Sequence, residues 1–568
     1  MKKDEERIGG ERTEPRAGGD RWDAEAFGIE SDTGEDMSSV IPQWICRGLA
    51  AGVRRFRFLS GTYEIRHPAA IRDFERLMGG DGAWDLGENT VDKHIWIDIA
   101  EVPSIELDFG GATLRFHGLI QPFSFRECGH VVIRNVKIDW FRPPFSQGRL
   151  VSVDPDAGTI DVRVEPAYPV RSGVPVAALM DFDNSPEALH PLRGAIDWFH
   201  CAESTELIAP QLLRIRLKGR YAERLASAGA ARPGGTGVVM RHIMNYKAAI
   251  LLYRCDRVEL EATAIYAAPG MGVIGHGCGD VTMRKLHVRR LPGSGRVMST
   301  NTDATHFIGC RGLIHFDECL FEGMGDDATN VHGFYMDILE QLDDRTLLCS
   351  IEADIQSEYP ERPETGDRLE LTDRATLQPY AEAFVAAARQ HPSGQNRVLL
   401  QFVNPLPARL SADDLLANAS RLAQLRFRHS VVRNNRARAI LVQTRGVEIS
   451  DNTFDSCTGT AIHVNCAVGW RESVCTRDVA IERNVFLDCG LHAGTYRQAS
   501  ALALMTESES SASGTHRGFR FADNRVRGNG LRGISLDGLT GGLVAGNVFE
   551  MTSEPIHLGQ CENIEMAE

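Results

Sequence analysis

A short pattern of apolar and polar positions returns along the whole chain. In each copy a small residue and a turn-like pair precede an apolar-x-apolar segment, the alternation that is typical of a short β-strand. Clear copies begin at Cys128, Cys255, Cys278, Cys310, Thr444, Thr476 and Cys561, and weaker copies begin at Val102, His516 and Thr540. Neighbouring copies lie 23 residues apart (Cys255 to Cys278) or 24 apart (His516 to Thr540). A strand-only repeat of this period predicts a parallel β-helix, a solenoid whose coils stack on one another.

Two long gaps interrupt the repeat. The copies at Cys128 and Cys255 are 127 residues apart, and those at Cys310 and Thr444 are 134 apart. Subtracting one coil of about 25 residues leaves two insertions of roughly a hundred residues each. Both contain strand–turn–strand patterns with Asp and Gly turns, so we expect two inserted antiparallel β modules that are barrel-like. A helix is predicted within the second module, near residues 381–390.

The ends of the chain complete the predicted organisation. The opening residues are charged and rich in glycine, which is typical of disorder. An amphipathic segment that ends at Ala51 predicts a helix that caps the open end of the first coil. The all-β chain then divides into a disordered N-terminal tail (1–23), the cap and first coils (24–141), the first inserted β module (142–245), coils with an acidic cluster (246–334), the second inserted β module (335–427) and the C-terminal coils (428–568).

Composition narrows the classes of function. A hydrophobic fraction of 43% and a charged fraction of 24% are ordinary for a soluble globular protein. A net charge of −15 argues against a nucleic-acid partner, which needs a basic stripe. We find no run of 18 apolar residues that suggests a membrane span and no apolar segment that suggests a signal peptide. The expected location is cytoplasmic, or secreted or periplasmic if a leader has been removed. Thirteen cysteines without a CxxC pair fit a reducing compartment.

Two residue types, cysteine and asparagine, recur along the chain, each at its own position of the repeat. We interpret the cysteines as stacked, buried thiols rather than as a metal site. We interpret the asparagines as structural groups that bond along a column of turns rather than as ligand contacts. The cysteines are Cys128, Cys255, Cys278 and Cys310, and the asparagines are Asn452, Asn484, Asn524 and Asn547.

Three carboxylates stand out just before the second insert. Asp303 lies 23 residues before Asp326, one period of the repeat, and Asp327 follows directly. Adjacent coils are about 4.8 Å apart, so the three side chains can meet on one surface, where their repulsion raises at least one pKa. Glycoside hydrolysis requires a protonated carboxyl beside a carboxylate. A separation of roughly 6.5–9.5 Å between them admits a water molecule and inverts the anomeric configuration.

The same three residues allow other interpretations. An Asp-Asp pair at a strand end is often a solvated turn, and clustered carboxylates also bind calcium. Gly323 and Gly325 permit a tight backbone and the close approach of a ligand, which favours a functional site.

Further motifs surround the acidic cluster. They are Asn301-Thr-Asp303, Gly325-Asp326-Asp327, His332-Gly333, Asn434-Asn-Arg-Ala-Arg438 and Trp470-Arg-Glu-Ser473. The first three motifs look like those of polygalacturonase-type β-helix hydrolases. The order of all five more closely resembles glycoside hydrolase family 110, the bacterial α-1,3-galactosidases. The resemblance covers nearly the whole chain from about residue 24. It implies a right-handed β-helix with inserted β-barrel domains. It also implies an exo-acting, inverting hydrolase of terminal α-1,3-linked galactose in blood-group-B-like or linear glycans.

By position, the resemblance implies that Asp326 is the general acid and that Asp303 and Asp327 hold and deprotonate the water, with no metal or organic cofactor. Adjacent residues of a regular strand face opposite ways, so Asp326 and Asp327 both reach the site only if the chain bends there. The candidate sugar-binding residues are Asn301, His306, Asn330, His332, Arg436, Arg438, Trp470 and Glu472. Each type has a plain alternative: a solvated arginine, a core tryptophan, or a histidine that only supports contact residues. Asn301 departs from the residue expected there in the family.

Two other functions stay open. A polygalacturonase carries Gly-His-Gly and Arg-Ile-Lys after its aspartate pair, whereas here Gly275-His276-Gly277 precedes the pair and Arg-Ile-Lys is absent. A non-catalytic glycan-binding β-helix would bind sugar without the three aspartates. The expected partner is an oligosaccharide or glycan with terminal α-galactose, without nucleic acid or membrane, and the inserts could form a homodimer contact.

Overall fold

The computed structural model describes residues 20–80, 94–183, 197–227, 236–351, 359–360, 362–392, 394, 396–490, 500–528 and 532–567. Of the expected disordered tail, residues 1–19 lie outside this range. Arg21–Asp23 form strand β1, which pairs in parallel with β2 (Arg55–Arg57). The prediction of disorder is therefore wrong for these residues, because pairing with the first coil satisfies their backbone groups.

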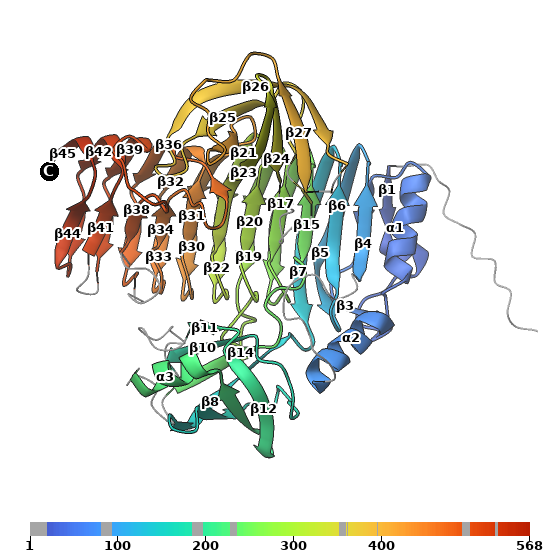
Figure 1. The fold of residues 1–568 in the computed structure, drawn as a ribbon. Helices are drawn as coiled ribbons and strands as arrows, with labels where there is room; N and C mark the ends of the chain where they lie inside the picture. The colour runs from blue at the N-terminus through green and yellow to red at the C-terminus, as the bar shows by residue number, and fades with distance from the viewer. Residues whose placement is uncertain are drawn as a thin grey trace, which may run out of the picture.

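The predicted parallel β-helix is confirmed: its coils stack along one axis (Figure 1). The first sheet consists of two ladders that merge in long strands. Its strands are β1, β2, β3 (Thr62–Ile65), β5 (Ser104–Phe116), β7 (His130–Trp140), β16 (Arg257–Ile265), β18 (Asp280–Arg284), β19 (His287–Val288), β21 (Leu313–Asp317), β22 (Leu320–Glu322), β29 (Gln424–Arg428), β30 (Val431–Arg433), β32 (Arg445–Ser450), β33 (Thr453–Asp455), β36 (Arg477–Glu482), β37 (Val485–Leu487), β39 (His516–Ala522), β40 (Arg525–Arg527), β42 (Leu539–Ala545), β43 (Val548–Glu550) and β45 (Glu562–Ala567).

The second sheet closes the other side of the solenoid and positions the acidic cluster. Its parallel strands are β4 (Ile95–Ala100), β6 (Gln121–Arg126), β15 (Ile250–Tyr253), β17 (Val273–His276), β20 (Thr305–Ile308), β23 (Thr329–Asp343), β31 (Ile440–Gln443), β34 (Ile462–Val464), β38 (Leu502–Leu504), β41 (Arg532–Leu536) and β44 (Glu554–Leu558). Alternate apolar residues of both sheets face one continuous core.

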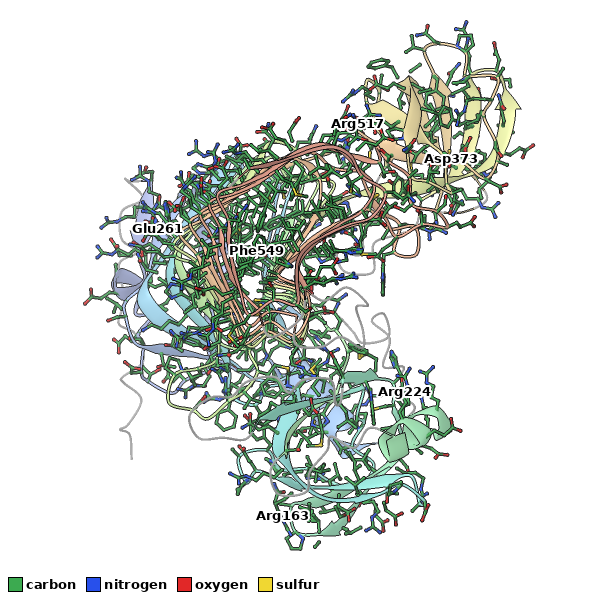
Figure 2. All side chains as sticks on the ribbon, turned by 90° about the vertical axis from the view of Figure 1, so that its left-hand side faces the viewer. Arg163, Arg224, Glu261, Asp373, Arg517 and Phe549 are labelled. Atoms are coloured by element: carbon green, nitrogen blue, oxygen red, sulfur yellow. The ribbon has the colours of Figure 1, made fainter. Side chains whose placement is uncertain are left out.

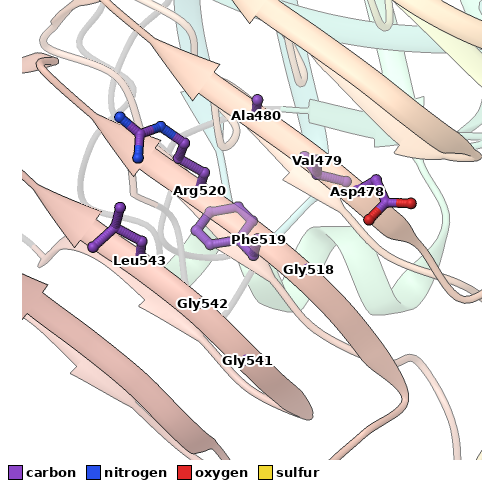
Figure 3. A pocket seen from close by; sticks show the side chains of 9 residues that line it. All are labelled: Asp478, Val479, Ala480, Gly518, Phe519, Arg520, Gly541, Gly542 and Leu543. Carbon is purple, nitrogen blue, oxygen red and sulfur yellow. The ribbon is translucent and has the colours of Figure 1, made fainter.

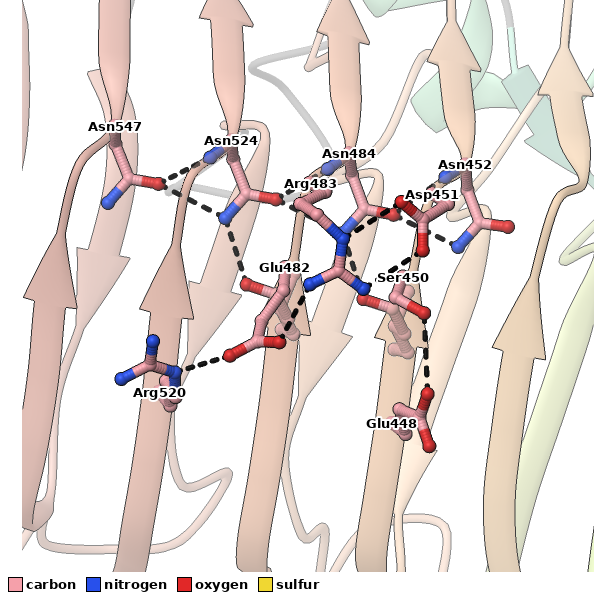
Figure 4. A network of polar contacts seen from close by, with 12 residues as sticks. Glu448, Ser450, Asp451, Asn452, Glu482, Arg483, Asn484, Arg520, Asn524 and Asn547 are labelled. Carbon is pink, nitrogen blue, oxygen red and sulfur yellow. Dashed lines mark hydrogen bonds and ion pairs between the residues drawn. The ribbon is translucent and has the colours of Figure 1, made fainter.

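Stacked identical residues hold neighbouring coils in register. The asparagines form the predicted structural column: the backbone N–H and Nδ2 of Asn452 donate to Asn484 Oδ1 at 3.0 and 2.9 Å. Asn484 and Asn524 repeat the pattern towards Asn547 (Figure 4). The predicted cysteine column is likewise confirmed, because its four thiols are buried and free.

A helical cap covers the N-terminal end, as expected. It comprises η1 (Ala24–Phe27), α1 (Val40–Ala50) and α2 (Pro68–Gly79). Trp44 of α1 packs edge-on against Phe56 with the ring centroids 5.2 Å apart, which buries the end of the first coil. Among the described residues, none of the helices has the length and apolar character to cross a membrane.

The first insert is a seven-stranded antiparallel sheet with its own core. In spatial order its strands are β11 (Asp197–Phe199), β10 (Ala178–Asp183), β14 (Thr236–Arg241), β8 (Phe145–Asp154), β9 (Thr159–Val164), β13 (Leu212–Leu217) and β12 (Ala202–Ala209), with helix α3 (Gly219–Ser227). Figure 2 shows this insert, labelled at Arg163 and Arg224, and the second insert, labelled at Asp373, projecting from the solenoid in different directions.

The second insert is a closed antiparallel barrel. The end of β23 starts it, followed around the barrel by β24 (Thr346–Ser350), β27 (Arg397–Phe402), β26 (Pro379–Gln390), β25 (Arg368–Thr372) and β28 (Leu415–Asn418), which returns to β23. The helix predicted near 381–390 is wrong. Its alanines favour a helix, but pairing with strands on both sides overrides this propensity.

Candidate active site

The three aspartates meet at the edge of the second sheet, just before two paired strands. Thr305 of β20 pairs with Thr329 of β23, and this register places Asp303 beside Asp327 on the next coil. Asp327 donates its backbone N–H to Asp303 Oδ1 at 3.2 Å. The chain bends at Asp326 before β23 begins, so adjacent side chains can face one site. One oxygen of each carboxylate lies within 4.8 Å of one oxygen of the other two.

The next coil adds an arginine to the same column. Thr329 pairs with Ile440, so Arg438 stacks on Asp327 although 111 residues of sequence separate them. The Arg438 guanidinium donates to Asp327 through Nε at 2.8 Å and contacts it through Nη2 at 2.7 Å, and its backbone N–H donates at 3.0 Å. This forked pair is the strong geometry for an arginine and a carboxylate.

Burial makes the protonation states of these acids interdependent. Asp303 is 5% exposed and Asp327 is 1% exposed, whereas Asp326 is only partly buried. Loss of hydration raises the pKa of Asp303 well above its usual range, and the neighbouring Asp326 raises it further. Burial also raises the pKa of Asp327, against the opposing effect of the Arg438 guanidinium. The buried carboxyls of the cluster therefore hold a proton more readily than exposed ones, which favours acid catalysis.

Two histidines extend from Asp303 in a row. His306 Nδ1 lies 2.7 Å from Asp303 Oδ2, and His306 Nε2 lies 2.8 Å from His332 Nε2. His332 Nδ1 lies 2.8 Å from the carbonyl oxygen of Gly333. Glu472 stands beside this row, 3.9 Å from His332. The set His306, His332 and Glu472, like the three aspartates, has the spacing of metal ligands, although its imidazole nitrogens are engaged with one another.

Other candidate sugar-binding residues gather at the same place. Asn330, at the position of His306 on the next coil, donates Nδ2 to Glu472 Oε1 at 3.2 Å. Glu472 belongs to β35 (Glu472–Ser473), which pairs with β23. Trp470, two residues earlier, is 70% exposed, so the alternative of a core tryptophan is wrong. A stacking contact between Trp470 and a sugar stays a prediction.

Two candidates do not face the cluster. Arg436 points into the first insert, where Nη1 donates to the Asp181 carbonyl at 2.8 Å. Asn301 is completely buried, and its Nδ2 donates to the Ile243 carbonyl at 3.0 Å. Each of these side chains therefore joins the solenoid to the first insert, and a sugar contact by either residue stays a prediction.

The first insert supplies a residue that sequence patterns did not indicate. Arg241, at the end of β14, is fully buried, and its Nη1 donates to the carbonyl of Asn301 at 2.6 Å and of Gly325 at 3.3 Å. These carbonyls precede Asp303 and Asp326. A Cβ on Gly325 would lie 2.1 Å from the Asn301 oxygen, so glycine is needed for this close approach. Arg241 thus fixes the distance between the two acid-bearing loops.

A groove of about 420 Å³ lies away from the acid cluster, on the first sheet. It is lined by Asp478, Val479, Ala480, Gly518, Phe519, Arg520, Gly541, Gly542 and Leu543 (Figure 3). Its glycines leave the surface hollow, but it has one carboxylate and no cluster of acids, so it offers no acid–base pair.

The sequence matches no protein-family model. It is 24% identical over 515 residues to α-1,3-galactosidase A of Bacteroides fragilis, covering 88% of this chain and 82% of that protein. With α-1,3-galactosidase A of Shewanella woodyi the identity is 24% over 567 residues, covering 94% and 88%. The chain resembles α-1,3-galactosidases along most of its length. This similarity confirms the resemblance that the motifs indicated.

Other comparisons are more distant or shorter. α-1,3-Galactosidase B of Akkermansia muciniphila is 27% identical over 415 residues, which are 69% of this chain but only half of that protein. Among solved structures, the Agl-KA catalytic domain aligns with a TM-score of 0.39 at 9% identity, over 96% of this chain and 68% of that one. A family 28 exopolygalacturonase of Yersinia enterocolitica aligns with a TM-score of 0.25 at 11% identity, over 96% and 78%.

Proposed function

We propose that this protein is an exo-acting glycoside hydrolase that releases terminal α-1,3-linked galactose. The observation that carries the proposal is the convergence of Asp303, Asp326 and Asp327 on one site, one coil apart. The similarity to α-1,3-galactosidases over most of the chain supports the linkage and the sugar. Blood-group-B-like and linear α-galactosides are the proposed substrates. A homodimer and a cytoplasmic location stay predictions from the sequence.

In the proposed mechanism Asp326 is the general acid. It is the least buried of the three carboxyls, so it is the one that an entering glycosidic oxygen can reach. Asp303 and Asp327, which lie behind it and are nearly sealed from solvent, hold the attacking water. Asp326 gives its proton to the leaving oxygen while Asp303 takes a proton from the water, and exchange with solvent restores both.

We further propose that the reaction inverts the anomeric centre. Both oxygens of Asp327 are bonded to Arg438, and both oxygens of Asp303 accept hydrogen bonds or face His306, which disfavours a covalent nucleophile. One observation favours retention instead. The closest oxygens lie within 4.8 Å, and the structure does not show the separation of 6.5–9.5 Å that is typical of inverting pairs.

Product analysis tests both parts of the proposal. The protein is incubated with α-1,3-galactobiose, a B-type trisaccharide and polygalacturonate, and released monosaccharide is measured. We expect galactose from the first two and no product from the third; galacturonate release would establish a polygalacturonase, and binding without release would establish a glycan-binding protein. NMR of the first-formed galactose should show the β anomer. An α anomer would overturn inversion.

A further inference from the structure

Asp303, His306, His332 and the Gly333 carbonyl form a row, called the histidine row below. Its hydrogen bonds determine how many hydrogens the two imidazole rings carry. The row has three contacts: Asp303 to His306 at 2.7 Å, His306 to His332 at 2.8 Å, and His332 to the Gly333 carbonyl at 2.8 Å. Each contact needs one hydrogen atom between its two heavy atoms. The carbonyl oxygen only accepts, so His332 Nδ1 carries a hydrogen, and two facing Nε2 atoms require one more.

The third contact depends on the state of Asp303. When Asp303 is ionised it has no hydrogen, so the contact to His306 Nδ1 must be filled by the imidazole. The two rings then hold three hydrogens, one more than two neutral imidazoles contain, and the pair carries one positive charge. When the hydrogen of this contact is on Asp303 Oδ2 instead of His306 Nδ1, both rings are neutral, and the total number of hydrogens is unchanged. One proton is thus shared by the whole row.

The surroundings favour keeping that charge next to Asp303. His306 is 3% exposed and His332 is 4% exposed, so solvent does not screen the row. The charged groups that face it from the packed elements are the carboxylates Asp326, Asp327 and Glu472 and the cations Arg438 and Arg241. The carboxylates of Asp326 and Glu472 repel an ionised Asp303 but attract a positive charge on the histidines beside it, and Arg438 is already paired with Asp327.

We propose, building on the function proposed above, that the His306–His332 pair carries one positive charge whenever Asp303 is ionised and thereby keeps this buried carboxylate available as the base. His306 is then a positioning residue that acts through Asp303. His332 and the Gly333 carbonyl fix the direction of the hydrogen bonds. The role of the histidines is electrostatic, and neither needs to touch the sugar.

The pH profile of kcat/KM tests the proposal. In His306→Gln an amide still donates to Asp303, but the positive charge is lost, so the pKa of Asp303 rises and the acidic limb moves to higher pH. A shift of about 1 to 3 pH units is expected from the loss of an opposite charge at this distance. Activity near neutral pH should fall at least about tenfold and recover as the pH rises. His332→Gln should shift the limb the same way.

A matched pair on the other sheet provides the control. His429 Nδ1 lies 2.8 Å from Asp317 Oδ1, but this pair is partly exposed and belongs to the first sheet. His429→Gln should leave the profile of the wild type unchanged. A uniform loss of activity in His306→Gln, with both limbs in place, would show a merely structural role and overturn the proposal.

A second readout is independent of activity. In protein labelled with ¹⁵N-histidine, one histidine should keep hydrogens on both ring nitrogens at pH 8, and this signal should be absent from His306→Gln. If no signal of a cationic ring at pH 8 disappears in that variant, the proposal is wrong even if galactose is released. If the signal behaves as expected but no sugar is released, the charge assignment stands and the proposed function fails.

Discussion

Two columns of polar side chains run along the same solenoid, and they satisfy their hydrogen bonds in different ways. In the asparagine column the amides of Asn452, Asn484 and Asn524 each donate to the next asparagine, ending at Asn547 (Figure 4). Each Nδ2 also donates to a backbone carbonyl, so the column needs no other side chain. In the acid column Asp303 stacks on Asp327, and two carboxylates offer each other only acceptors.

This difference shows which hydrogen-bonding groups a stacked position requires. An amide has both a donor and an acceptor, so a column of identical amides is complete by itself. A column of acids needs partners of another residue type, and here they are Arg438, on the coil beyond the second insert, for Asp327 and His306 for Asp303. Arg241 of the first insert bonds instead to the backbone carbonyls of the two loops that carry the acids. The solenoid therefore supplies the partners of its own acids, and the first insert holds the backbone of the acid-bearing loops through Arg241.

Removing one charge from the acid cluster should have the largest effect on kcat. Asp326→Asn keeps the shape of the side chain but cannot donate a proton to the leaving oxygen. We expect kcat to fall by about 10²–10⁴, with a melting temperature equal to or above that of the wild type because a like charge is lost. Kinetics and thermal unfolding measure the two effects.

Asp478→Asn, in the groove of the first sheet, is the control and should keep normal kcat. Near-normal turnover in Asp326→Asn would rule out its role as the acid.

Removing the cation of the acid column should cost stability in a pH-dependent way. Arg438→Met leaves Asp327 buried without its partner, which we expect to cost about 3 kcal/mol at pH 8. The folded-state pKa of Asp327 rises further above its unfolded value, so the protonated form is favoured at low pH and stability falls as the pH rises. Chemical unfolding at pH 5 and pH 8 measures this slope.

Arg445→Met is the control variant for the effect on kcat. It breaks a similarly buried ion pair, in which Arg445 Nη1 lies 2.7 Å from Glu370 Oε1. It should also destabilise the fold, but kcat should change only in Arg438→Met. Equal kcat values in the two variants would contradict a link between Arg438 and catalysis.

Adding a charge to the asparagine column should make it behave like the acid column. Asn484 Nδ2 donates to the Ile449 carbonyl at 2.9 Å and to Asn524 Oδ1 at 3.1 Å. Asn484→Asp loses both donors when ionised, so we expect a cost of about 1–3 kcal/mol at pH 7 and a smaller one at pH 4. Denaturant unfolding measures it, and kcat should be unchanged. Equal stability at both pH values would show that the column does not exclude charge.

The smallest effect is expected at the rim of the site. Trp470→Ala removes an exposed ring, so stability should change by no more than about 0.5 kcal/mol. If the ring stacks on the sugar, KM for the B-type trisaccharide should rise several-fold with kcat unchanged. Phe141→Ala, which removes a ring of 67% exposure, serves as the control. An unchanged KM in Trp470→Ala would remove the tryptophan from the binding site.

The repeat period explains how much of the site could be predicted from the sequence. Coil spacing brings Asp303 to Asp327 and Arg438, because each lies a whole number of coils from the next once the insert is removed. Arg241 could not be found in this way, since it reaches the site through the tertiary docking of the first insert. The direction of Arg436 could not be predicted for the same reason, because its partner Asp181 belongs to that insert.

The fold, too, could be predicted only in part from the sequence. Alternating strands with a period near 23 predicted the solenoid and the positions of both inserts along the chain. The alanines of segment 381–390 favour a helix, but this segment belongs to strand β26 because it pairs with β25 and β27. Local sequence patterns thus predict structure that depends on contacts between neighbouring coils. They fail where the structure depends on strands that are distant in the sequence.

A crystal structure of Asp326→Asn with α-1,3-galactobiose tests the central claim most directly. We predict that the glycosidic oxygen lies within hydrogen-bond distance of residue 326. A water molecule held by Asp303 and Asp327 should lie on the opposite face of the galactose ring. A disaccharide bound in the groove beside Asp478, or bound at the acid cluster with its anomeric carbon turned away from all three positions, would contradict the account.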